Sequence, residues 1–355
     1  MDIIKSKNSL IVFKDKGLEL FKDSLIKNNY SKLFVLVDEN TKKNCLSFIL
    51  KHIDGLSQVD ILEIKSGEIN KNLATCEHLW NQLSKFGADR KSAIINLGGG
   101  VICDLGGFVA STFKRGISFY NIPTTLLSIV DASVGGKTGI DFGTLKNQIG
   151  VFKEPKMVLI LTKWLKTLER KQILSGFSEM LKHGLILDKK YWKKLSALKT
   201  IDINNLDKMV LKSISLKNSI VLEDLKEENK RKVLNFGHTL GHAVESNYMG
   251  TKKELLHGEA IAIGMILETF LSHKILGLSF NDLDNITKTI SHFFKKIKIK
   301  KPEVLKIINL LKHDKKAREG KINFVLINQV GTAKIDILIN NKLIKESFNF
   351  YNSLS

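Results

Sequence analysis

Two hydrophobic periods alternate along roughly the first 160 residues, and this alternation constrains the fold more than any other feature of the chain. Short apolar runs rich in β-branched residues are separated by amphipathic stretches of helical length. The apolar runs are Leu10–Phe13, Leu33–Val37, Ile61–Ile64 and Ala93–Leu97. Such alternation predicts an α/β domain built on a largely parallel sheet.

After about residue 165 the strand signal fades and helical periodicity replaces it. The segments with this periodicity are 171–187, 203–223, 257–275 and 282–294. Near the end, Ile322–Ile327 and Ala333–Ile339 flank a glycine-containing turn, as the strands of a hairpin would. With 355 residues the chain is long enough for two cores. We expect a parallel-sheet domain over residues 1–165 and a mainly α-helical domain over residues 166–355.

The composition indicates which binding partners and which cellular compartment to expect. A net charge of +20 would suit nucleic acid or an anionic membrane, but lysine is interleaved with isoleucine and asparagine, without a basic block that contains aromatic residues. The three cysteines lie far apart without CxxC spacing, so neither a disulfide framework nor a cysteine zinc site is indicated. No run of about 18 apolar residues occurs. We expect a soluble cytoplasmic protein that binds neither nucleic acid nor membrane.

A glycine triplet, Gly98-Gly99-Gly100, follows an apolar strand and opens a helix-like stretch. Glycine allows a pyrophosphate to approach the backbone, and a helix N-terminus supplies N–H groups and a positive dipole end. The spacing is not GxGxxG, and a lone triplet is equally typical of a tight turn. Asp38, at the end of an earlier strand, could hold a ribose, and Ser66–Lys71 follows the next strand at the same sheet edge. Together these features favour a dinucleotide site.

A Gly-Gly-Lys-Thr fragment at residues 135–138 is similar to the end of a P-loop. The glycine that a P-loop requires five positions before Gly136 is missing. We therefore interpret the segment as an anion site in which Lys137, Lys146 and Asn147 donate to phosphate or carboxylate. The plain alternative is a surface ion pair between Asp131 and Lys137.

Three histidines indicate a metal centre. His238 and His242 are four residues apart and share a helix face, and His257 follows closely. Glu179 is a carboxylate candidate, and catalytic zinc typically takes three His or carboxylate ligands and keeps one position open. Spacing alone does not decide whether His238 or His242 is the ligand. For Glu245, one turn beyond His242, a surface charge is favoured over a role in orienting a ligand.

Arg231 and Asn235 precede His238 by seven and three residues. They share a helical face with it if the helix begins early, and otherwise they line one loop.

Taken in order, these motifs resemble 3-dehydroquinate synthase over about residues 30–330. Five blocks carry the resemblance: Gly98–Phe108, Ile122–Thr138, Gly176–Gly184, Leu234–Glu245 and Leu256–Met265. The resemblance implies a Rossmann-like N-terminal domain, a helical second domain and a homodimer.

The resemblance also implies roles for individual residues. The ligands of Zn²⁺ or Co²⁺ would be Glu179, His238 and His257, with His242 as the proton-shuttling histidine. Substrate contacts would come from Asp131, Lys137, Asn147, Lys182, Lys217, Arg231 and Asn235, from Arg115 in the neighbouring subunit's site, and from Lys315 or Lys316 at the carboxylate. NAD contacts would come from Asp38, Glu68, Lys71, Gly99, Gly100, Val101, Asp104, Thr124, Thr125, Leu127, Lys137, Lys146, Thr167 and Leu168.

The activity that the resemblance implies is that of a carbon–oxygen lyase of the shikimate pathway, which leads to the aromatic amino acids. The enzyme would convert 3-deoxy-D-arabino-heptulosonate 7-phosphate to 3-dehydroquinate and phosphate. NAD would oxidise C5 transiently and be regenerated in each turnover.

Two segments depart from the family pattern: Asp141-Phe142-Gly143 stands in place of Asn-His-Pro, and Glu169–Gln172 in place of Pro-x-Arg-Glu. The changed loop favours a rival, a sister cyclase of sedoheptulose 7-phosphate or glucose 6-phosphate. Asn147, Arg231 and Asn235 argue against that rival, together with Lys315 and Lys316 as partners for a substrate carboxylate. A metal-dependent polyol dehydrogenase would accumulate NADH, and a basic binding module would show salt-dependent affinity for nucleic acid.

Overall fold

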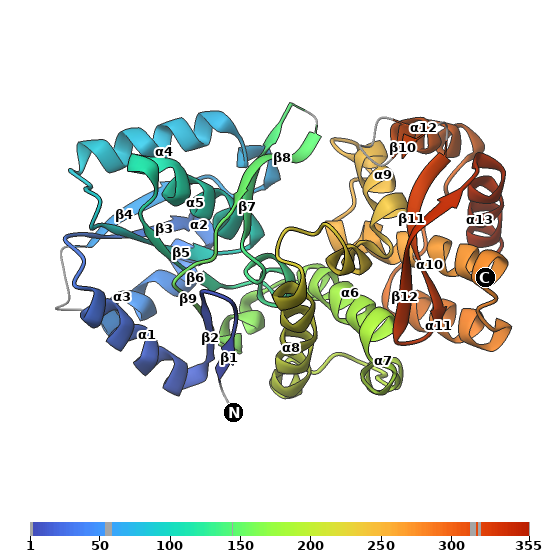
Figure 1. The fold of residues 1–355 in the computed structure, drawn as a ribbon, viewed down its shortest axis with the longest axis horizontal. Coiled ribbons are helices and arrows are strands. Elements are labelled where there is room, and N and C mark those ends of the chain that lie inside the picture. Colours follow the sequence, from blue (N-terminus) through green and yellow to red (C-terminus); the bar gives the residue numbers. More distant parts are fainter. Residues whose placement is uncertain (1–2, 54–58, 144, 313–316, 319–320, 355) are drawn as a thin grey trace. The chain divides into compact units, whose positions relative to one another are not determined.

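The computed structural model describes residues 3–53, 59–143, 145–312, 317–318 and 321–354 (Figure 1). The chain divides into two compact units. The first comprises Met1–Glu169 and Lys217–Lys226, and the second comprises Arg170–Leu216 and Glu227–Ser355. Helix α8 (Asp207–Glu223) therefore begins in the second unit and ends in the first. No local pattern in the sequence signals that return.

The first unit contains a seven-stranded sheet in the order β1-β2-β9-β6-β5-β3-β4. All neighbouring pairs are parallel except β1 and β2, so the predicted parallel sheet is confirmed. Its strands are β1 (Ile3–Lys5), β2 (Leu10–Phe13), β3 (Leu33–Asp38), β4 (Val59–Ile64), β5 (Ala93–Gly98), β6 (Ser118–Pro123) and β9 (Met157–Ile160). The helices of this unit are α1 (Lys14–Asn28), α2 (Glu39–Thr41), α3 (Ser47–Ile53), α4 (Leu73–Lys85) and α5 (Gly100–Thr112).

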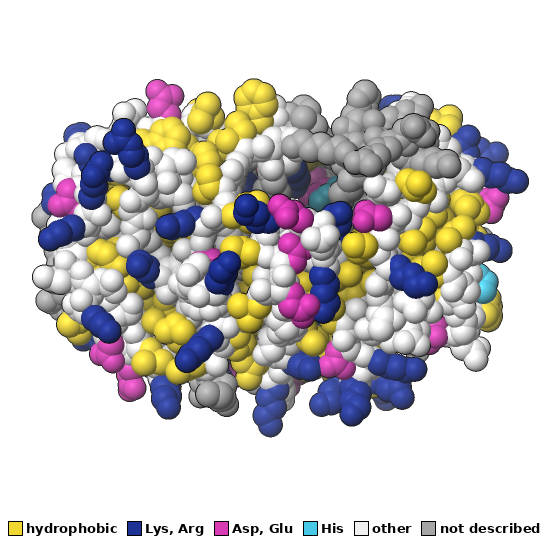
Figure 2. Space-filling view, viewed as in Figure 1, with side chains coloured by type: hydrophobic (Ala, Val, Ile, Leu, Met, Phe, Trp, Pro, Cys, Tyr) yellow, Lys and Arg dark blue, Asp and Glu magenta, His cyan; other side chains and the backbone are white. Residues whose placement is uncertain are grey.

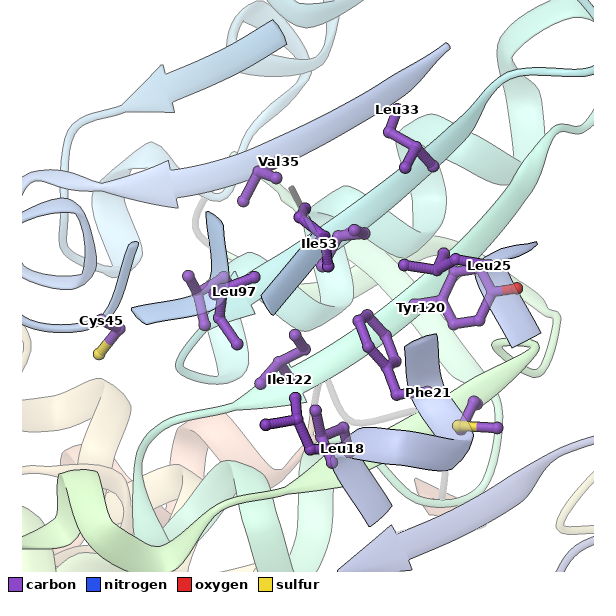
Figure 3. Close-up of a cluster of buried hydrophobic side chains, with 14 of the residues drawn as sticks. Leu18, Phe21, Leu25, Leu33, Val35, Cys45, Ile53, Leu97, Tyr120 and Ile122 are labelled. Carbon is purple, nitrogen blue, oxygen red and sulfur yellow. The ribbon is translucent and has the colours of Figure 1, made fainter. Parts of the chain in front are cut away.

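The sheet is buried on both faces. Along β3, Leu33, Val35 and Val37 belong to one apolar cluster, while Phe34 and Leu36 belong to another. This division follows from the two-residue period of a strand. Figure 3 shows the first cluster, in which side chains from α1 and from several strands pack together. Burial on both sides explains why these strands are continuous apolar runs in the sequence.

A two-stranded hairpin, β7 (Lys137–Phe142) and β8 (Leu145–Phe152), forms a separate antiparallel sheet in this unit. This hairpin was not expected from the sequence patterns. Gly139 pairs with Gly150, and a Cβ built on Gly139 would lie 2.5 Å from the Ile149 carbonyl oxygen. Close approach of the two backbones thus requires glycine, which weakens the strand signal of the sequence.

The second unit is mainly helical. Its helices are α6 (Arg170–Leu187), α7 (Lys189–Ser196), the first part of α8, α9 (His238–Tyr248), α10 (His257–Leu276), α11 (Phe280–Phe293), α12 (Lys301–Lys312) and α13 (Asn341–Ser353). Strands β10 (Ala317–Arg318), β11 (Lys321–Gln329) and β12 (Thr332–Ile339) form an antiparallel sheet, so the predicted helices and hairpin are confirmed. Residues on every side of α10 are buried, as expected for a helix that is apolar all round.

Positive charge is spread over the face of the molecule that Figure 2 shows. Lys and Arg side chains lie across this face and along its lower edge, and acidic side chains are interspersed with them. This distribution agrees with a solvated, lysine-rich surface. Within the described part of the chain, none of the helices is both long enough and apolar enough to span a membrane.

Candidate active-site residues in the two units

The three predicted histidines converge in the second unit. His238 and His242 lie one turn apart at the start of α9, and His257 is the first residue of α10. Their ring centroids are 5.1 to 5.6 Å apart. One nitrogen from each ring lies within 4.8 Å of the others, which is close enough for the rings to share an ion.

Glu179 lies in the middle of α6 with a fully buried carboxylate. One oxygen is 3.7 Å from Nε2 of His238, and the other is paired with Lys182, one turn further along the helix. Apart from the ion pair with Lys182, neither oxygen has a hydrogen-bond partner within the described part of the chain. Because burying a carboxylate with few donors is costly, a metal ion beside the oxygen that faces His238 would compensate further. The donor set of one carboxylate and imidazole nitrogens fits zinc or cobalt.

Glu245 is buried, so the prediction from the sequence that it is a surface charge was wrong. The residue is 6% exposed, and its Oε2 lies 3.2 Å from Nδ1 of His257. A carboxylate on one ring nitrogen fixes the tautomer and orientation of the imidazole, which leaves the other nitrogen for a metal. Helical periodicity did not reveal this because the burial of α9 depends on which helix packs against it.

Burial and the positive charge of Lys182 hold the pKa of His238 well below its usual range. The imidazole is therefore neutral at pH 7, which is the protonation state that binds a metal.

Arg231 and Asn235 lie on a separate 3-10 helix over Lys230–Asn235, before α9. Gly237, with φ of +79°, separates the two helices, so α9 does not begin early enough to include Arg231 and Asn235, and these residues belong to a short 3-10 helix where a loop was the expected alternative. Arg231 is buried, and the Asn235 amide donates to Glu227 over 2.6 Å.

A polar cluster in the first unit brings together residues predicted to contact NAD and substrate. The buried Lys71 ammonium donates to Oδ2 of Asp104 and to Oδ1 of Asn147, each over 2.6 Å. Burial alone would lower the pKa of Lys71, but the negative charges of Asp104 and Glu68 outweigh burial and raise it. Asp141 belongs to the loop that differs from the family pattern. Its carboxylate accepts the Asn147 N–H over 2.7 Å and so supports the backbone of Asn147, which has a φ of +51°.

The glycine loop joins β5 to α5, as predicted. Gly99 is the N-cap residue of α5, and a Cβ on it would lie 3.2 Å from the Thr125 methyl group. The Thr124 N–H donates to the Gly98 carbonyl over 3.0 Å, so the two threonines at the end of β6 lie beside the loop. Val101 follows in the first turn of α5, with Asp104 one turn on.

Other predicted residues of the first unit occupy varied settings. Asp38 caps α2 by accepting from Thr41, and the Thr167 hydroxyl donates to a backbone carbonyl. Lys146 lies 3.8 Å from Glu68. Leu127 and Leu168 flank short helical turns.

Asp131 and Lys217 form an ion pair inside the first unit. The Lys217 ammonium donates to Oδ1 of Asp131 over 2.5 Å and to its carbonyl oxygen over 2.6 Å, and Lys217 is 5% exposed. Asp131 belongs to a π-helical turn, Ser128–Ala132, and Lys137 is exposed at the start of β7. Arg115 is exposed at a turn after α5, with φ of +68°. Lys315 and Lys316 lie outside the described residues.

Comparison with known proteins covers nearly the whole chain. The family model of the 3-dehydroquinate synthase N-terminal part matches residues 61–175, and that of its C-terminal part matches residues 176–317. The 3-dehydroquinate synthase of Parabacteroides distasonis is 41% identical over 98% of both chains, and that of Campylobacter hominis is 39% identical over 93% of both.

Among solved structures, 2-deoxy-scyllo-inosose synthase complexed with carbaglucose-6-phosphate, NAD⁺ and Co²⁺ superimposes with a TM-score of 0.88 at 25% identity. The match covers 98% of this chain and 99% of that one. The 2-epi-5-epi-valiolone synthase of Streptomyces hygroscopicus, with NAD⁺ and Zn²⁺ bound, shares the fold with a TM-score of 0.83 at 22% identity, over 98% of both chains. The matched family models and the full-length relatives establish that this chain belongs to the 3-dehydroquinate synthase family.

Proposed function

We propose that this chain converts 3-deoxy-D-arabino-heptulosonate 7-phosphate to 3-dehydroquinate and phosphate. Glu179, His238 and His257 carry this proposal, because a fully buried carboxylate beside His238, whose ring nitrogen lies close to that of His257, is a donor set for a catalytic divalent metal. Full-length relatives named 3-dehydroquinate synthase support the same reaction. A cytoplasmic location, a place in the shikimate pathway and a homodimeric state belong to the proposal.

NAD and zinc or cobalt are the proposed cofactors, since related cyclases were crystallised with NAD⁺ and with Co²⁺ or Zn²⁺. When bound, they supply reversible hydride transfer at C5 and polarisation of the C5 oxygen. Glu179, His238 and His257 would hold the metal. The glycine loop at the N-terminus of α5 and the threonines beside it would hold the dinucleotide.

The chain's own side chains have matching tasks. His242 is exposed beside the other two histidines, and an imidazole nitrogen can both accept and donate a proton, which suits the shuttling of a hydroxyl proton. The cationic side chains of Lys182 and Arg231 would bind substrate phosphate and carboxylate and orient the substrate. Both are almost fully buried, so their charges would act in a medium of low dielectric constant. We include Arg115 and Lys316 among the substrate contacts on resemblance alone.

The first experiment is a turnover assay with zinc and catalytic NAD. Phosphate release and 3-dehydroquinate, detected by coupling to dehydroquinase, should appear in equal amounts without accumulation of NADH. Accumulated NADH would instead indicate a dehydrogenase.

The variant His257→Ala should lose both metal and turnover. His78→Ala, a histidine on α4 in the first unit, is the matched control and should keep both. An active, metal-replete His257→Ala enzyme would refute the ligand assignment.

A sister cyclase is the second candidate, favoured by the full-length superposition on 2-deoxy-scyllo-inosose synthase. Turnover of glucose 6-phosphate or sedoheptulose 7-phosphate, with none of the heptulosonate, would establish it. The contact of Asp141 with the Asn147 backbone weakens this candidate, because the altered loop has a structural task in the first unit.

A further inference from the structure

Two of the three clustered histidines adjoin a glycine whose backbone N–H is held by a buried side chain from another helix. Beside His238, the Gly237 N–H donates to Oε2 of Glu268 over 2.6 Å, and the Leu240 N–H donates to Oε1 over 3.1 Å. Glu268 lies on α10 and is fully buried. One carboxylate therefore ties α10 to the first turn of α9.

The second contact lies beside His257. The Gly258 N–H, in the first turn of α10, donates to Oγ of Ser175 over 3.0 Å. Ser175 is 2% exposed and lies on α6, one turn before Glu179. A Cβ on Gly258 would lie 2.2 Å from the Ser175 carbonyl oxygen, so the two backbones are in direct contact. Contacts through Glu268 and Ser175 thus join the three helices that carry the proposed metal ligands.

The helix packing around these contacts leaves little room for adjustment. A Cβ on Gly264 of α10 would lie 2.0 Å from the Gly237 carbonyl oxygen, and one on Gly241 would lie 3.1 Å from the Ala260 carbonyl oxygen. Helices α9 and α10 therefore touch through backbone atoms, and a change at the start of α9 moves His238 relative to His257.

Glu268 caps the N-terminus of α9, which has no side-chain cap of its own. The first N–H groups of a helix need partners outside the helix, and Gly237, the N-cap residue, has no side chain to offer. A carboxylate at this end also interacts favourably with the helix dipole. Its loss would leave buried N–H groups without an acceptor, and the first turn of α9 would then rearrange or fray.

We propose that Glu268 and Ser175 are positioning residues that fix the backbone beside His238 and His257 and thereby set the affinity of this centre for a divalent metal. The inference rests on the metal centre of the proposed function and extends it beyond the ligands. Supporting groups that hold metal ligands in place typically contribute about 10- to 100-fold in metal affinity. For Glu268→Gln, which keeps the shape but replaces one acceptor oxygen by a donor, we expect a rise of that size in the zinc dissociation constant. Ser175→Ala should raise the constant about tenfold.

Zinc affinity of the full chain is measured by competition with a chromophoric chelator, and the visible absorption of the Co²⁺-loaded protein reports the coordination geometry. The control is Thr269→Val, on the same helix and equally buried, whose hydroxyl donates to the Met265 carbonyl. Urea unfolding of the metal-free variants shows how far each substitution merely destabilises the chain.

Weaker zinc binding and an altered Co²⁺ spectrum in Glu268→Gln and Ser175→Ala, with Thr269→Val like the parent, would support the proposal. Should one variant fail to fold, the other decides. Unchanged affinity, or equal loss in Thr269→Val, would overturn the proposal, and so would a parent chain that binds no divalent metal. A parent that binds zinc but does not form 3-dehydroquinate would refute the proposed function and leave this inference standing.

Discussion

Replacing Asp104 by asparagine should destabilise the first unit by about 2–3 kcal/mol. The Lys71 side chain is only 4% exposed and its ammonium lies 2.6 Å from Asp104, whose side chain is 19% exposed. Removing one partner of a buried ion pair costs about 3–5 kcal/mol, because the remaining charge stays buried without compensation. Partial exposure of Asp104 and the remaining contact of Lys71 with Asn147 reduce this cost.

The double variant Lys71→Met with Asp104→Asn tests whether the cost of Asp104→Asn comes from the Lys71 charge that it leaves buried and unpaired. Without either charge, no buried ion remains unpaired, so the double variant should be more stable than Asp104→Asn alone. The negative charges of Asp104 and Glu68 raise the pKa of Lys71 in the folded chain. The stabilisation that they give is therefore complete below the pKa of lysine in the unfolded chain, roughly 10.4, and is lost as the pH rises through the pKa of Lys71 in the folded chain.

The assay is urea unfolding at pH 8, followed by circular dichroism. Hydrogen exchange of peptides from β5 and α5 shows whether the loss is located in the first unit. A loss below about 0.5 kcal/mol, typical of an exposed pair, would refute the reasoning. A double variant no more stable than Asp104→Asn would refute it as well.

Three further predictions concern other groups. Glu245→Gln should weaken zinc binding by about 10- to 100-fold, because the amide orients His257 less well; chelator competition measures this, and parental affinity would contradict it. Since burial lowers the pKa of His238, the unfolded metal-free chain binds a proton that the folded chain does not. Stability to urea should therefore fall as the pH drops below about 6.5, and His238→Gln should reduce that dependence. Burial raises the pKa of Cys45 and Cys76 to about 12, so both should resist a thiol reagent at pH 8 until urea unfolds the chain; rapid labelling of the native protein would contradict this.

Local patterns were sufficient for much of the fold. Strands β2, β3 and β5 and helices α6 and α10 were predictable because burial on a sheet or along a helix imposes a period on the sequence itself. The cluster of histidines was predictable for a similar reason, since a spacing of four residues places His238 and His242 on one helix face. The resemblance of five ordered motifs added the ligand roles.

Tertiary structure alone decided the contacts between residues far apart in the chain. Glu245 follows His242 like any residue on a helix, and only the packing of α10 against α9 places it at the ring of His257. The pairing of Lys217 with Asp131, and the acceptor that Glu268 provides for α9, likewise join distant segments. The partner of a charged residue cannot be predicted from the neighbouring sequence. It is determined by how helices and strands pack against one another and by which polar groups that packing removes from water.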